Sequence, residues 1–191
     1  MLKSKWSKLA VWLASLAPAV WLGYGVYASR LGPNPIEAVT HATGDWTLRF
    51  LLASLAVTPA RRLLRLPDLI RFRRMLGLWA FFYAFLHLMT WVWLDKFFDP
   101  AEMWADVQKR RFVTAGMAGF LCLVPLALTS TAGWIRRLGR NWQRLHRLAY
   151  AAAAAGVVHY WWLVKSDIRL PALYGAILVG LLALRLALRR G

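Results

Sequence analysis

The chain has 191 residues, of which 60% are hydrophobic, and it carries 12 Trp and a formal net charge of +17. This composition excludes an ordinary soluble domain and is typical of a polytopic membrane protein. Its one cysteine, Cys122, excludes an internal disulfide and provides too few ligands for an iron–sulfur cluster or a structural zinc site. The positive charge does not indicate nucleic acid binding, because the basic residues cluster between apolar segments.

Six apolar segments follow one another along the chain, and we expect each to cross the bilayer as a helix. They are Leu9–Ala28, Trp46–Ala60, Met75–Leu94, Phe112–Thr131, His146–Val164 and Pro171–Leu188. The second is the weakest because it is short and carries Arg49, although this side chain can reach the interface. The sequence predicts an all-α fold, a polytopic membrane helix bundle with six transmembrane helices in a single domain over residues 1–191. It shows no repeat of 20–50 residues.

The charge distribution predicts the orientation of this bundle. With six spans, the side that carries the N-terminus receives seventeen of the 25 Lys and Arg residues and one of the eight acidic residues. Basic loops favour the cytoplasmic side of a membrane. Both termini are therefore predicted to be cytoplasmic, with the basic residues against membrane lipid.

Two histidines lie inside apolar segments that are rich in aromatic residues: His87 in AFFYAFLHLMTWVW and His159 in GVVHYWWLV. An ionisable side chain at membrane depth is costly unless it faces a partner or a ligand. At 1.5 Å per residue, the two imidazoles lie about 18 and 20 Å along their segments, at a similar depth in the outer half of the bilayer. They are predicted to ligate one haem, and the alternative is a core histidine bonded to a neighbouring carbonyl. His41, in the predicted outer loop THATGDW, is expected to be solvated.

A second cofactor site is indicated near the cytoplasmic side. His146 lies in NWQRLHRLAY, and Arg73 precedes the histidine of the third segment by fourteen residues, which returns to nearly the same helix face, about 40° away. These residues can flank a second haem or hold a flavin phosphate, or His146 can be a plain interfacial histidine. On a straight helix His146 and His159 are about 140° apart, so a shared cavity requires a distortion, which Gly156 would permit.

Five motifs follow one another along the chain: GDWTLRFLLASLAVTPARR, RRMLGLWAFFYAFLH, LALTS, WQRLHRLAY and HYWWLVK. In this order they closely resemble the MsrQ family, the membrane haem subunit of the bacterial periplasmic methionine-sulfoxide reductase system within the ferric-reductase-like transmembrane group. The resemblance implies a multi-pass inner-membrane cytochrome with one or two haem b groups and FMN. By motif, His87 and His159 match the haem-iron ligands and His146 matches the third intramembrane histidine. The wider group has two histidines on each of two helices, whereas here Arg73 takes the place of one.

The resemblance also implies the partners. Electrons would come from the quinone pool or a cytoplasmic flavin reductase and pass to a periplasmic molybdopterin-containing catalytic subunit that reduces methionine sulfoxide in oxidised proteins. The chain would then be an electron-transfer subunit with no substrate site of its own, since no nucleophile–base pair stands out. One alternative is a non-redox carrier for haem or metal, which would predict inverted repeats or broken helices near the midplane. Another is a stand-alone metal reductase, which keeps the haem and changes the acceptor.

Overall fold

The apolar segments form long helices in the computed structural model, which describes residues 4–190. Within that range the chain is helical and contains no strand, which confirms the all-α prediction. It divides into two units, the first ending at Asp99 and the second beginning at Pro100. Lys3, one of the basic residues counted for orientation, lies outside the described residues. The single domain over residues 1–191 stays a prediction.

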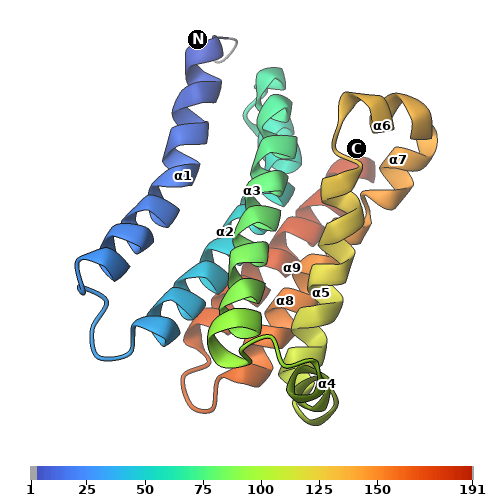
Figure 1. Ribbon diagram of the computed structural model, residues 1–191. Helices are drawn as coiled ribbons and strands as arrows, with labels where there is room; N and C mark the ends of the chain where they lie inside the picture. Colours follow the sequence, from blue (N-terminus) through green and yellow to red (C-terminus); the bar gives the residue numbers. More distant parts are fainter. Residues whose placement is uncertain (1–3, 191) are drawn as a thin grey trace. The chain divides into compact units, whose positions relative to one another are not determined.

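The first unit is built around two antiparallel helices, α2 and α3, that pack side by side along their length (Figure 1). Its elements are α1 (Lys5–Tyr27), α2 (Pro35–Leu63), the 3-10 turn η1 (Pro67–Leu69), α3 (Ile70–Met89) and the π-helical turn η2 (Thr90–Asp95). The π-helical turn begins three residues after His87, and the Thr90 hydroxyl donates to the His87 carbonyl at 2.7 Å. Such turns are rare and often mark functional positions in a helix.

Helix α2 begins well before the apolar segment that predicted it. Asn34 caps its N-terminus by accepting from the Glu37 amide at 3.3 Å, and Pro35 occupies the first helical position. The predicted outer loop THATGDW is therefore wrong, because these residues are helical and His41 lies exposed on α2. A search for apolar runs misses this first part of α2, because the residues before Trp46 are largely polar. The capping residues Asn34 and Pro35 do mark where the helix begins.

Tyr83 of α3 joins α1 to the rest of the first unit. Its fully buried ring stacks on Phe50 of α2, with centroids 5.3 Å apart. Its hydroxyl donates to the Ser15 carbonyl at 2.8 Å and accepts from the Ala19 amide at 3.0 Å. These two groups are one helical turn apart, and Pro18 lies between them, where a proline weakens the backbone hydrogen bonding of a helix. The Tyr83 hydroxyl therefore provides both backbone groups with a hydrogen-bond partner next to the proline.

We expect Tyr83→Phe to destabilise the docking of α1, because the Ser15 carbonyl and the Ala19 amide lose their shared partner. Leaving buried backbone groups unsatisfied costs about 1–3 kcal/mol. The measurement is thermal unfolding of the purified protein in detergent, with the exposed Tyr27→Phe as the matched control. Equal stability of the two variants would contradict this role for the hydroxyl.

The second unit is built around another antiparallel pair, α5 and α8, with α9 against α8 (Figure 1). Helix α4 lies at one end of α5, and α6 and α7 lie at the other end (Figure 1). The elements are α4 (Pro100–Lys109), α5 (Arg111–Leu128), α6 (Ala132–Leu138), α7 (Arg140–Leu145), α8 (Leu148–Leu163) and α9 (Arg169–Arg190). The distortion that Gly156 would permit does not occur, because α8 runs through Gly156 unbroken, and the helical run is interrupted at His146 and Arg147 instead.

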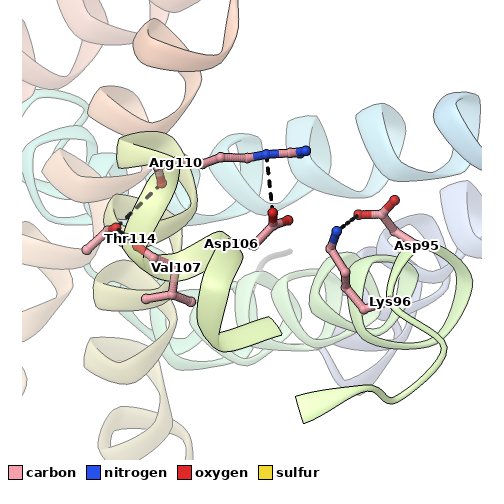
Figure 2. A network of polar contacts seen from close by, with 6 residues as sticks. All are labelled: Asp95, Lys96, Asp106, Val107, Arg110 and Thr114. Atoms are coloured by element: carbon pink, nitrogen blue, oxygen red, sulfur yellow. Dashed lines mark hydrogen bonds and ion pairs between the residues drawn. The ribbon is translucent and has the colours of Figure 1, made fainter. Parts of the chain in front are cut away.

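Polar contacts fix the corner between α4 and α5 (Figure 2). The Arg110 guanidinium pairs with the largely buried Asp106 carboxylate at 3.3 Å, and the Thr114 hydroxyl donates to the Val107 carbonyl at 2.6 Å. Because Thr114 is on the first turn of α5, these bonds hold the beginning of this helix. In the first unit, Lys96 pairs with the neighbouring Asp95 at 3.5 Å (Figure 2).

Four stretches of the described residues are long and apolar enough to cross a membrane: Lys5–Tyr27, Pro67–Asp95, Arg111–Leu128 and Arg169–Leu188. Helix α8 is shorter, at 16 residues. Helix α2 carries charges, of which Arg49 lies 3.6 Å from Asp45 and over the ring of Trp46. The count of six spans and the cytoplasmic termini stay predictions.

Candidate functional site

The His87 imidazole projects from α3 onto α2, at a glycine. Its Nδ1 donates to the Thr40 carbonyl at 2.9 Å, and the Thr43 hydroxyl lies 3.5 Å from the same nitrogen. A carbonyl oxygen only accepts hydrogen bonds, so this contact places the proton of the neutral ring on Nδ1. The Thr43 hydroxyl itself donates to the Val39 carbonyl at 2.8 Å, which leaves its oxygen to face the ring. The ring lies beside Gly44, which gives it room to approach the helix backbone.

The His159 imidazole is held in the same way in the second unit. It projects from α8 onto α5, and its Nδ1 donates to the Phe112 carbonyl at 2.6 Å. The ring lies against Gly116, one helical turn after Phe112. Since Phe112 lies in the first turn of α5, the polar corner between α4 and α5 also holds the carbonyl that His159 uses.

These contacts define which nitrogen of each ring can bind a metal. With the proton on Nδ1, the lone pair of a neutral imidazole is on Nε2. A core histidine with no ligand would also donate to a carbonyl, so this contact alone does not distinguish the two interpretations. The contact occupies only Nδ1, however, and Nε2 keeps its lone pair. Metal-ligating histidines generally donate their other ring N–H to a carbonyl or carboxylate, so the observed donor chemistry fits an axial haem ligand.

Arg73 and His146 lie at the opposite ends of the same helix pairs. Arg73 is half-buried near the beginning of α3, and its carbonyl accepts from the Ser54 hydroxyl of α2 at 2.8 Å. Because α3 is unbroken between Arg73 and His87, the predicted placement of both on one helix is confirmed. His146 follows α7, and its Nδ1 donates to the Trp142 carbonyl at 3.0 Å.

Trp142 is a residue of this second position that the sequence did not indicate. Its ring stacks on the His146 imidazole with centroids 3.7 Å apart, and its Nε1 donates to the Thr129 carbonyl at the end of α5 at 2.9 Å. The tryptophan therefore ties His146 to the end of α5 opposite His159. The family motifs LALTS, which contains Thr129 at the end of α5, and WQRLHRLAY, which begins with Trp142, marked the region but not this contact.

Comparison with known proteins identifies the class. A family model described as "Ferric reductase like transmembrane component" matches residues 42–157, a range that begins within α2 and ends within α8, two residues before His159. The fold and this match define a multi-pass helical protein of the bacterial inner membrane in the ferric-reductase-like class. No solved structure matches the chain.

Curated relatives narrow the family further. The chain is 52% identical to a protein-methionine-sulfoxide reductase heme-binding subunit MsrQ from Caulobacter vibrioides, over 92% of this chain and 84% of the relative. It is 51% identical to the MsrQ of Rhodospirillum rubrum, over 98% and 92% of the two chains, and to that of Herminiimonas arsenicoxydans, over 93% and 83%. The chain belongs to the MsrQ family.

Proposed function

We propose that this chain is a haem-binding electron-transfer subunit in which His87 and His159 are the axial ligands of one b-type haem. The observation that carries the proposal is the contact that the Nδ1 of each ring makes with a carbonyl of the neighbouring helix. Each donates its Nδ1–H to a helix carbonyl and so directs its lone pair to Nε2. The matched depth of the two histidines, derived from the sequence, and the relatives that are named heme-binding subunits support it.

Such a haem would be held and oriented by the two imidazoles, whose own orientations the chain fixes. When bound, a haem iron supplies one-electron redox chemistry without a substrate site on the protein. The carbonyls of Thr40 and Phe112 fix the two ring orientations. The aromatic cluster of the first unit, which includes Tyr83 and Phe50, surrounds the inner part of α3 with apolar groups.

A second redox position, near the cytoplasmic side, completes the proposal. Arg73 and His146 stand at the ends of their helix pairs away from His87 and His159. The Arg73 guanidinium and the His146 imidazole, which stacks on Trp142, suit either a second haem or FMN. An arginine can hold the phosphate of FMN by paired hydrogen bonds. On this proposal, electrons enter there from the quinone pool or a cytoplasmic flavin reductase. They leave from the outer haem to a periplasmic molybdopterin-containing subunit that reduces methionine sulfoxide.

We expect His87→Ala and His159→Ala each to abolish the dithionite-reducible low-spin spectrum of the outer haem, because six-coordination needs both ligands. The measurement is the reduced-minus-oxidised spectrum and haem content of the purified variants. His41→Ala is the matched control, since this histidine is exposed on α2 close to the His87 contact. A full low-spin spectrum in either test variant would contradict the paired ligation.

We expect His146→Ala to slow reduction by the cytoplasmic-side donor and to leave the spectrum of the outer haem in place. The reason is that His146 is at the end of α5 opposite the carbonyl that holds His159. Donor-driven haem reduction, followed by reoxidation with the periplasmic subunit, measures the effect. Normal rates in both steps would make His146 an interfacial histidine with no redox role.

A further inference from the structure

We infer that Gly44 and Gly116 are positioning residues that set the reduction potential of the haem, by letting each ligand imidazole reach a backbone carbonyl of the neighbouring helix. The inference rests on the proposed ligation by His87 and His159. It adds a role for two residues that carry no functional group.

The space at each glycine is taken up by the imidazole. A Cβ at Gly116 would lie 2.7 Å from Nδ1 and 3.0 Å from Cε1 of His159. A Cβ at Gly44 would lie 3.2 Å from Nδ1 and 3.1 Å from Cε1 of His87. Any side chain at Gly116 therefore has to push the ring away, whereas at Gly44 the ring has to yield by only a few tenths of an ångström. Glycine inside a helix is destabilising by roughly 0.5–1 kcal/mol relative to alanine, so its presence at both contacts requires a reason.

The close approach places each ring on the carbonyl that precedes the glycine by one helical turn. His87 reaches the Thr40 carbonyl beside Gly44, and His159 reaches the Phe112 carbonyl beside Gly116. A hydrogen bond from Nδ1–H to an acceptor makes the opposite nitrogen a stronger donor to a metal. Stronger donation stabilises ferric over ferrous iron, so these contacts lower the reduction potential.

The arrangement occurs twice, which argues that it is selected and not incidental. In both units the histidine is on the later helix of the pair, and the donor and acceptor residues are 47 positions apart. The surrounding side chains differ: Thr43 stands beside the His87 ring, whereas Phe112 itself lies near the His159 ring, with centroids 6.0 Å apart. What the two units share is the glycine, the carbonyl and the imidazole.

Other glycines of the chain have different surroundings and provide controls. A Cβ at Gly119, one turn further along α5, would lie 3.3 Å from the Ala155 Cβ of α8, a tight helix–helix contact that involves no imidazole atom. A Cβ at Gly77 of α3 would lie 3.4 Å from the Ser54 hydroxyl, and one at Gly180 of α9 would meet nothing within 4 Å. Alanine at Gly77 or Gly180 tests helix propensity, and alanine at Gly119 tests crowding of α5 against α8, in each case without direct contact between the added Cβ and an imidazole.

The experiment is potentiometric titration of the haem in Gly116→Ala and Gly44→Ala, with electron paramagnetic resonance of the ferric state. Loss of one Nδ1–H bond changes the ferric-to-ferrous ratio at fixed potential by the difference in strength of that bond between the two oxidation states, which is up to about tenfold. We expect a higher midpoint potential and altered g values in both variants, with the larger shift in Gly116→Ala. Gly77→Ala and Gly180→Ala should keep the parent potential, and Gly119→Ala, which crowds the same helix pair without touching the ring, should shift it less than Gly116→Ala does.

An unchanged potential and unchanged g values in both test variants, with haem retained, would overturn this inference and leave the ligation intact. If Gly116→Ala loses its haem, Gly44→Ala decides, because its contact requires the smaller displacement. Failure of the proposed function is recognised separately, by a low-spin spectrum that survives His87→Ala or His159→Ala. A shift of equal size in Gly119→Ala would also contradict the inference, because packing alone would then explain it.

Discussion

An imidazole inside an apolar helix pair needs a hydrogen-bond acceptor for its ring N–H within the protein. In this chain the acceptor is a backbone carbonyl, and the close pairing of the helices depends on that contact. A polar group buried without a hydrogen bond costs several kcal/mol in a medium without water. The chain has no acidic residue in the segments around His87 and His159. Backbone carbonyls of the neighbouring helix take the place of a carboxylate, which requires the helices to be close and the intervening residue to be glycine.

The need for a carbonyl acceptor explains why each unit contains one closely packed helix pair, α2 with α3 and α5 with α8. Each pair carries an imidazole contact toward one end and a cationic or imidazole side chain, Arg73 or His146, toward the other. A backbone carbonyl contributes no charge, so the ligands of the proposed haem stay neutral and the site suits one-electron chemistry in a low dielectric. The basic residues near the other end can then meet anionic groups, whether of a cofactor or of lipid.

The sequence predicted the helical class, the family and the histidines, because long apolar runs and ionisable residues within them are strong signals. It missed the beginning of α2, since Thr40, Thr43 and Gly44 lie in a polar stretch that reads as a loop. It also missed Gly116 and Phe112, whose role depends on a backbone oxygen and an absent side chain. It also did not indicate the interruption at His146 and Arg147 between α7 and α8, since no glycine or proline marks it, whereas Gly156, where a distortion was possible, lies within the unbroken α8.

The central claim is that both imidazoles bind one iron through Nε2 while Nδ1 donates to a helix carbonyl. Pulsed electron paramagnetic resonance of the ferric protein, prepared with histidine labelled with nitrogen-15 at Nε2 only or at Nδ1 only, tests it most directly. The account predicts strong hyperfine coupling from two nitrogens in the Nε2-labelled protein and weak coupling in the Nδ1-labelled protein. Strong coupling from Nδ1, or from one histidine nitrogen alone, would contradict it.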